Sequence, residues 1–184
     1  MAGPPRHAMV RAATADDALA IATVQASTWR ATYRGLLDDD ALDALDPVAN
    51  SERYRAHLEL PLPERHVETL VATVSGAVVG YVAYGPQRTP ADAVDGGLGE
   101  LHALYVLPEH QGRGLGTALL SAACAGLRRR GCARAVLWVL TGNAATRAFY
   151  ERHGWVRDGA GRVEVVMGAR VDEVPYAREL SDDG

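Results

Sequence analysis

Lysine is absent from the 184-residue sequence, and all 19 of its basic residues are arginine. A Walker-type phosphate loop ends in Gly-Lys-Ser/Thr, so the missing lysine excludes that nucleotide-binding motif. Cysteine occurs only twice, as Cys124 and Cys132, and neither belongs to a CxxC pair, which argues against a zinc site and a disulfide scaffold. We therefore expect a protein without a metal, in a reducing compartment.

Long apolar runs and an excess of positive charge are also missing. No apolar stretch approaches the length of about 18 residues that indicates a membrane-spanning helix, and the first residues lack the apolar core of a signal peptide. The net charge of −4 gives no general attraction to a phosphate backbone. The basic run from Arg128 to Arg130 follows an apolar helical pattern, and we interpret it as a solvated helix end. We therefore expect a cytoplasmic protein with no nucleic-acid or membrane partner.

Length and composition predict one globular domain. A domain has roughly 100–200 residues, so a chain of 184 residues leaves little room for a second. Hydrophobic residues at 48% and charged residues at 23% match ordinary globular usage. We expect residues 1–184 to form a single domain, with residues 1–7 and 181–184 as flexible tails.

The order of the expected elements indicates a mixed sheet flanked by helices, an α/β fold. Two β-branched runs separated by Ser75-Gly76 predict a hairpin. Thr14 is expected to cap the first helix and Ser51 a later one. The expected strands span 9–12, 67–74, 77–84, 99–107, 134–140, 155–157, 163–171 and 173–180, and the expected helices span 14–33, 38–45, 51–60, 115–127 and 144–152.

A glycine-rich segment follows the strand expected at 99–107 and precedes a helix. Glycines at positions 112, 114 and 116 let the backbone come close to a ligand, and the amides at the start of the helix point toward it with a favourable dipole. This arrangement is typical of an anion-binding loop and suits a pyrophosphate. The dinucleotide fingerprint GxGxxG is excluded because its last glycine would fall at Thr117.

The chain resembles the GNAT superfamily of N-acetyltransferases, whose acetyl-CoA loop has the pattern Gln/Arg-x-x-Gly-x-Gly/Ala. Here the pattern reads Gln111-x-x-Gly114-x-Gly116, after a strand that ends Leu-Tyr-Val-Leu-Pro. The resemblance covers about residues 8 to 180. Further matching residues are Asn143, Ala144, Phe149, Tyr150, Gly154 and Trp155 in the later motif, and Trp29, Tyr33, Gly35 and Leu36 near the start.

The resemblance implies a fold and a co-substrate. The fold is a mostly antiparallel central sheet with one splayed parallel pair, flanked by helices, and the co-substrate is acetyl-CoA, with no metal. The backbone of Leu104, Tyr105 and Val106 would pair with the pantetheine arm, and Asn143 would contact the pantetheine or phosphate region. Backbone amides of the loop would hold the pyrophosphate, namely those of Gln111, Gly112, Arg113, Gly114, Leu115, Gly116 and Thr117, with the Arg113 side chain adding charge at the rim.

Acetylation of an amine requires a base and an acid. An alkyl ammonium has a pKa of about 10.4 and must lose a proton before it attacks, and the leaving thiolate, with a thiol pKa of about 8.5, needs a proton donor. Tyr150 matches the family's general acid, although it can also simply pack on the cofactor. Glu100 matches the family's general base and can alternatively be a paired or solvated carboxylate. His102 is a second candidate base or relay, or a histidine that only makes hydrogen bonds.

The acceptor side carries weaker signals. Trp29 and Tyr33 lie one helical turn apart, and such a pair more often packs in a core, although it can also line an acceptor pocket. A cluster of carboxylates either attracts a cationic amine or caps helices and forms a solvated face, and we favour the second interpretation. These carboxylates are Asp38, Asp39, Asp40, Asp43 and Asp46.

The sequence therefore predicts an N-acetyltransferase that moves an acetyl group from acetyl-CoA to a primary amine of a small molecule, by direct attack in a ternary complex. One alternative is acetylation of a protein or peptide, which needs an open groove. Another is a non-catalytic module that binds acyl-CoA, and the presence of both Glu100 and Tyr150 argues against it. Members of the family often dimerise, so a homodimer is a further possibility.

Overall fold

The computed structural model describes residues 8–61, 64–87 and 97–180. The expected tails, and most of the segment between the strands expected at 77–84 and 99–107, lie outside these residues. The helices are α1 (Ala18–Tyr33), α2 (Asp39–Asp43), α3 (Pro47–Glu59), α4 (Leu115–Arg129) and α5 (Ala144–Arg152). The strands are β1 (Ala8–Ala12), β2 (Glu68–Val74), β3 (Ala77–Pro86), β4 (Leu98–Val106), β5 (Arg134–Leu140), β6 (Val156–Arg157), β7 (Arg162–Val166) and β8 (Ala169–Glu179).

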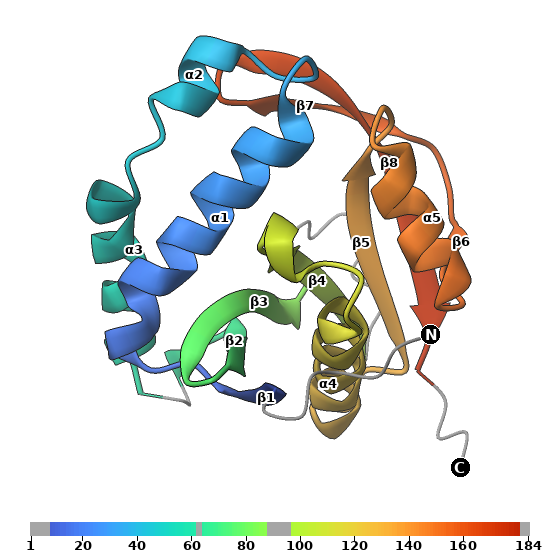
Figure 1. Ribbon diagram of the computed structural model, residues 1–184. Coiled ribbons are helices and arrows are strands. Elements are labelled where there is room, and N and C mark those ends of the chain that lie inside the picture. Colours follow the sequence, from blue (N-terminus) through green and yellow to red (C-terminus); the bar gives the residue numbers. More distant parts are fainter. Residues whose placement is uncertain (1–7, 62–63, 88–96, 181–184) are drawn as a thin grey trace.

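The strands form one eight-stranded sheet in the order β1-β2-β3-β4-β5-β8-β6, with β7 paired to β8. All pairings are antiparallel except β4 with β5, which are parallel and pair only where Leu98–Glu100 meet Arg134–Val136. Beyond Glu100 the two strands diverge, while β4 stays on β3 and β5 stays on β8. The expected α/β fold with a splayed parallel pair is therefore confirmed (Figure 1).

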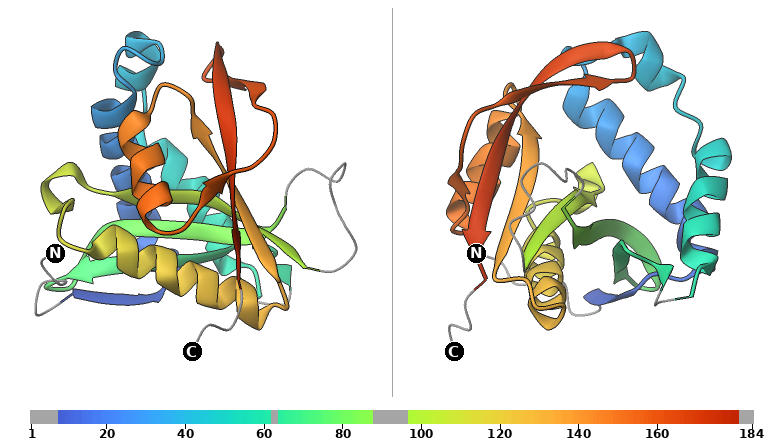
Figure 2. Two further views of the ribbon diagram at one scale, coloured as in Figure 1. Left: turned by 90° about the vertical axis from the view of Figure 1, so that its right-hand side faces the viewer. Right: turned by 180° about the vertical axis from the view of Figure 1, so that it is seen from behind.

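Three groups of buried side chains hold the helices on the sheet. The main cluster joins α4 to the sheet through residues such as Leu119 and Leu127. The α1 cluster packs α1 and α3 on the opposite face and includes Ile21 and Leu58. The hairpin cluster joins Leu37, Leu42 and Val171, with Trp29 and Tyr33 packed against them, and so connects α1 and α2 to the β7–β8 hairpin. The right-hand view in Figure 2 shows this hairpin arching toward α2.

Two expected boundaries are wrong, each because of local turn chemistry. The helix that we expected to start at Ser51 starts at Pro47, because the Asp46 carboxylate accepts hydrogen bonds from the amides of Val48 and Ala49 at 2.8 and 3.3 Å. Proline fits the first helical position, where its missing N–H is not needed. The last two long strands meet at a Met167-Gly168 turn rather than near residue 172, and both turn residues have positive φ angles.

Asp17 fixes the start of α1 and gives the fold a pH dependence. Its carboxylate accepts a hydrogen bond from the Thr14 amide at 2.8 Å and pairs with the Arg11 guanidinium at 2.7 and 2.8 Å. The hydrogen bond from Arg11 lowers the pKa of Asp17. The resulting stabilisation is therefore present above the unfolded pKa of about 3.9, and it is lost as the pH falls through the lower pKa of the folded state.

We expect Asp17→Asn to lower the free energy of unfolding by about 1 kcal/mol near neutral pH, since it removes the ion pair with Arg11 and the negative charge that accepts the hydrogen bond of the Thr14 amide. The difference from wild type should shrink toward zero in acid, at about pH 2. Urea unfolding at both pH values measures this. Asp16→Asn, at an exposed neighbouring carboxylate, is the matched control. An equal loss for Asp17→Asn at both pH values would contradict the assignment.

Candidate functional site

The glycine-rich loop places free backbone amides at the start of α4. Gly112 and Gly114 have φ angles of +71° and +79°, which are left-handed conformations that glycine adopts without strain. Gly114 is the N-cap of α4 and no side chain caps the helix. The first α4 amide with a partner inside the helix is that of Ala118, which donates to the Gly114 carbonyl at 3.0 Å. The preceding amides are therefore available to an anion, as the pyrophosphate of coenzyme A requires.

Side chains around the loop hold it to the sheet and to α5. The Gln111 amide donates to the Val106 carbonyl at 2.9 Å, so this side chain ties the loop to the end of β4. The Thr117 hydroxyl lies 2.9 Å from His153 Nε2, and Nδ1 of the same ring lies 2.7 Å from the Phe149 carbonyl. His153 is a loop contact that sequence reasoning missed, because nothing in the pattern of α5 indicates it.

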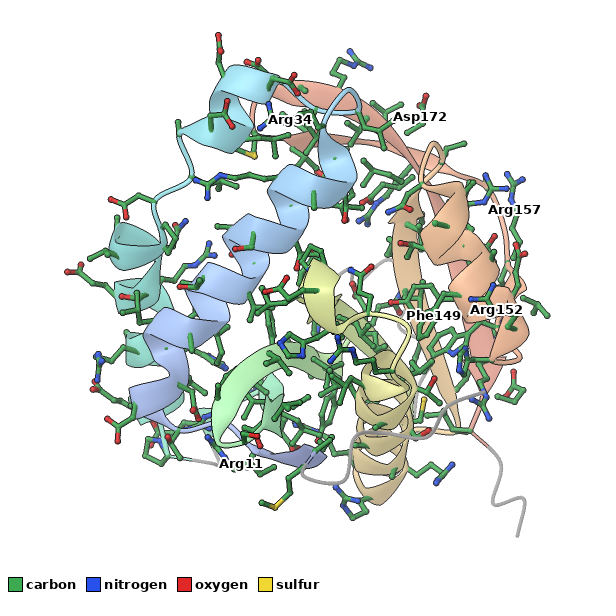
Figure 3. The ribbon with its side chains drawn as sticks, in the orientation of Figure 1. Arg11, Arg34, Phe149, Arg152, Arg157 and Asp172 are labelled. Carbon is green, nitrogen blue, oxygen red and sulfur yellow. The ribbon has the colours of Figure 1, made fainter. Side chains whose placement is uncertain are left out.

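Phe149 and Arg113 occupy different environments beside this loop. Figure 3 shows Phe149 between α5 and α4, where a Cβ added to Gly116 would lie 3.4 Å from its ring. Arg113 is exposed at the rim. The Phe149 ring therefore explains why a small residue suits position 116. The exposed position of Arg113 leaves its charge accessible to a ligand at the loop.

The diverging edge of β4 lies next to the loop. Residues Leu104, Tyr105 and Val106 pair with β3 on one side, and within the described residues they have no strand partner on the side that faces β5. An extended arm can form backbone hydrogen bonds with such an edge. The loop amides and this edge together fit the diphosphate and the pantetheine arm of coenzyme A.

Asn143 has a structural contact that the sequence did not predict. It is the N-cap of α5, is 7% exposed, and its Oδ1 accepts a hydrogen bond from the Thr146 amide at 3.1 Å. This bond fixes the side chain as the cap of α5, and contact of Asn143 with the pantetheine or phosphate region stays a prediction.

Tyr150 is 6% exposed, and no residue that the structure describes forms a hydrogen bond with its hydroxyl. Its ring packs edge-on against Phe149 and Trp155, with centroids 5.2 and 5.9 Å away. Burial raises the pKa of Tyr150, and the neighbouring Tyr105 and Cys124 raise it further. The phenol is therefore protonated at neutral pH and can donate its proton.

Glu100 lies where β4 and β5 begin to diverge. It is 1% exposed and is the last β4 residue that pairs with β5, opposite Val136. The pairing of β4 with β3 shifts register just beyond it, so the strand is not regular there. His102 Nδ1 nevertheless lies 3.6 Å from Glu100 Oε1. The structure thus brings together the two residues that were predicted as alternative bases.

Trp29 and Tyr33 pack together as expected for a core pair, and their role in lining an acceptor pocket stays a prediction. Their ring centroids are 5.5 Å apart, and Trp29 also contacts Tyr105 at 6.4 Å. Both are half-buried and pack against the hairpin cluster. Burial raises the pKa of Tyr33 to about 12, and the nearby Tyr150 and Glu173 also raise it. Tyr33 is therefore near both the Tyr150 phenol and Glu173, a buried carboxylate of β8 that the sequence analysis missed.

The acidic segment caps helices, as favoured from the sequence. Asp38 accepts a hydrogen bond from the Asp40 amide and caps α2, and Asp46 caps α3. Asp39 and Asp43 form exposed ion pairs with Arg34. Across residues 8–61, 64–87 and 97–180, no group of three His, Cys, Asp or Glu side chains is placed to hold a metal ion, and no helix is long and apolar enough to cross a membrane.

Comparisons with known proteins agree with this geometry. The family model described as Acetyltransferase (GNAT) family matches residues 29–155. The N-acetyltransferase YuaI of Bacillus subtilis is 29% identical over 167 residues, which cover 90% of this chain and 89% of that protein. The fold matches the PaiA N-acetyltransferase of Thermoplasma acidophilum in complex with coenzyme A, with a TM-score of 0.70 and 18% identity over 94% of this chain and 98% of the other. It also matches YncA of Salmonella typhimurium with acetyl-CoA, with a TM-score of 0.70 and 24% identity over 96% of both chains.

Proposed function

Because the chain belongs to the acetyltransferase (GNAT) family and is an acetyl-CoA-dependent N-acetyltransferase, we propose that it acetylates a primary amine of a small molecule by direct transfer in a ternary complex. The observation that carries this proposal is the divergence of β4 from β5 beyond Glu100, which leaves Leu104, Tyr105 and Val106 without a strand partner on the β5 side within the described residues. We assign Glu100 as the base and Tyr150 as the acid of one transfer step.

Acetyl-CoA supplies the activated acetyl thioester. Glu100 accepts a proton from the acceptor ammonium, directly or through water, and so frees the nitrogen lone pair for attack. Burial raises the pKa of Tyr150, so its phenol is protonated when the sulfur departs and donates a hydrogen bond to the negative charge that develops there. As the amide forms, its nitrogen loses a second proton; the phenol passes its own proton to the sulfur and takes up this one, so no tyrosinate remains.

The two cysteines support direct transfer over a route through an acetylated enzyme. Cys124 is 3% exposed, and burial raises its pKa. Burial also raises the pKa of Cys132, which lies beyond the far end of α4 from the glycine-rich loop. A nucleophilic cysteine needs a lowered pKa, so neither thiol is suited to carry the acetyl group.

The packing around Tyr33 supports a small acceptor. The hairpin cluster packs α1 and α2 against β7 and β8 beside Tyr33. Leu36, in the turn after α1, packs against Gly142, since a Cβ added there would lie 2.9 Å from its side chain. A folded protein segment needs an open path across this region, whereas a small amine does not.

A screen for release of free coenzyme A tests the proposal. Purified protein is given acetyl-CoA with a panel of small amines and a panel of peptides, and acetylated products are identified by mass spectrometry. Turnover of small amines is the expected result. Turnover of peptides alone would assign protein acetylation, and tight binding of coenzyme A without turnover of any acceptor would indicate a non-catalytic module.

Glu100→Gln is expected to lower kcat by about 10²- to 10⁴-fold, because an amide of the same shape cannot take up the proton. His102→Gln is expected to cost less than about tenfold if the ring only orients the carboxylate. Coenzyme A affinity, measured by calorimetry, should be unchanged in both. Glu52→Gln, at an exposed position of α3, is the control. A larger loss for His102→Gln would make His102 the base, and no loss in either variant would reject both.

A further inference from the structure

A cluster of charged and aromatic side chains lies on one face of β5, β8 and β7. Leu140, Glu173 and Arg162 are direct partners on these three neighbouring strands, so their side chains leave the sheet on the same face. Trp138 lies two residues before Leu140 and shares that face. We call Trp138, Arg162 and Glu173 the arginine clamp.

The face that carries the arginine clamp points toward α1. Val171, two residues before Glu173 on β8, packs in the hairpin cluster together with Tyr33. The carboxylate of Glu173 also contributes to the raised pKa of Tyr33, after burial and together with Tyr150. Leu140, the direct partner of Glu173, packs in the same hairpin cluster, so the clamp lies on the side of the sheet that faces Tyr33. We take this side as the acceptor side of the proposed reaction.

Arg162 is held in one orientation. Its guanidinium carbon lies 4.0 Å from the centroid of the Trp138 ring, and Nε and Nη2 lie 3.0 and 2.9 Å from Glu173 Oε2. These contacts use one edge of the guanidinium. Nη1 has no hydrogen-bond partner within the described parts of the chain, and 31% of the Arg162 side chain is exposed.

A guanidinium with one fixed edge and one open edge is suited to bind a carboxylate. The planar fork matches the two carboxylate oxygens, and stacking on an aromatic ring removes much of the side-chain entropy before a ligand arrives. Glu173 is 9% exposed and pairs with Arg162, and the carboxylate of Glu164 lies 3.6 Å from the same Nη2. The two carboxylates suit the ammonium of a zwitterion, and the open Nη1 of Arg162 suits its carboxylate.

We infer that the acceptor carries a carboxylate in addition to its amine, and that Arg162 binds this carboxylate through its open edge. This inference rests on the proposed function, because it assigns the substrate class of the same site. Amino acids and related amino-carboxylates are then the acceptors. Glu173 and Trp138 are positioning residues, since they act by holding the guanidinium.

Matched pairs of acceptors test the inference. Each pair differs only in the carboxylate, such as phenylalanine with phenethylamine and leucine with isoamylamine. We expect wild type to have a higher kcat/KM for the carboxylate-bearing member of at least one pair. In Arg162→Gln the ratio of the two kcat/KM values should fall by about 10- to 100-fold, mainly through KM, as expected for loss of a charge-assisted hydrogen bond. The two amines of a pair differ in basicity, but this difference is the same for every variant. It therefore cancels when the kcat/KM ratio of the pair is compared between variants.

Two further variants separate binding from folding. Arg162→Gln alone leaves the Glu173 carboxylate without its arginine partner, so the double variant Arg162→Gln/Glu173→Gln removes both charges and should show the same loss of preference. Arg170→Gln, at an exposed arginine on the opposite face of β8, is the control and should keep the wild-type ratio. Calorimetry with coenzyme A should give the wild-type affinity for all variants.

Three outcomes would overturn the inference. If wild type acetylates the carboxylate-free amines as well as their partners, or if Arg162→Gln keeps the wild-type ratio, the acceptor is not bound through Arg162, while the proposed transfer to a small amine stands. If no small amine of either kind is acetylated, the proposed function fails and the inference fails with it.

Discussion

Replacing Tyr150 by phenylalanine is expected to lower kcat by about 10²- to 10⁴-fold, the usual contribution of a general acid. The substitution removes one oxygen and leaves the ring, which packs against Phe149 and Trp155 in the main cluster. The departing thiolate would then have no proton donor at that place. Binding of acetyl-CoA should change little, since it depends on the loop amides and the β4 edge.

The pH dependence gives a second readout for Tyr150. Burial raises the pKa of its phenol above the ordinary value of about 10, so the acid form persists through the alkaline range in which most proteins are assayed. Wild-type kcat should therefore show no decline from this group as the pH rises toward about 9. In Tyr150→Phe, the residual kcat should rise with pH only because a larger fraction of the acceptor amine is deprotonated.

Tyr84→Phe is the matched control for Tyr150→Phe. Tyr84 is buried and donates a hydrogen bond to Glu68 at 2.8 Å, on the part of the sheet covered by α4. Loss of its hydroxyl should lower the free energy of unfolding by about 1 kcal/mol and leave kcat near wild type. Equal kcat values for wild type and Tyr150→Phe, measured by thiol release, would reject the acid role.

The parts of the site that follow local rules were predictable from the sequence. The loop pattern around Gly114 predicted the anion-binding start of α4, and the structure has free amides and positive φ angles there. The bounds of β5 and α5 match the expected 134–140 and 144–152. These features depend on glycine conformations and on hydrophobic periodicity, which a short stretch of sequence encodes.

Other parts depend on strand register, which pattern alone does not encode. Arg162, Trp138 and Glu173 are far apart in the sequence and meet because of the pairings of β5 and β7 with β8. The register shift of β4 beyond Glu100 is also a property of its pairing with β3. The contact between Thr117 and His153 needs α4 and α5 to lie side by side. Each arises from tertiary packing, so each required the structure.

Replacing Gly114 by valine is expected to raise the dissociation constant of coenzyme A by about tenfold or more. Gly114 has a φ of +79° at the N-cap of α4, and a side chain in the left-handed region costs roughly 1–2 kcal/mol, more for a β-branched one. The chain relieves this strain by moving the backbone, and the amides that follow it move too. Since 1.4 kcal/mol corresponds to about tenfold in affinity, a small shift of several donors is enough.

Gly76→Val separates the effect on binding from the cost of strain. Gly76 has a φ of +85° in the turn between β2 and β3, and a Cβ there would meet nothing within 4 Å. Both valine variants should therefore lose similar unfolding free energy in urea, while only Gly114→Val loses affinity for coenzyme A in calorimetry. If both variants bind the coenzyme as tightly as wild type, the amides at the start of α4 do not hold its pyrophosphate. In that case the free donors of this helix serve no ligand, and the coenzyme must depend on the β4 edge and on side chains such as Arg113.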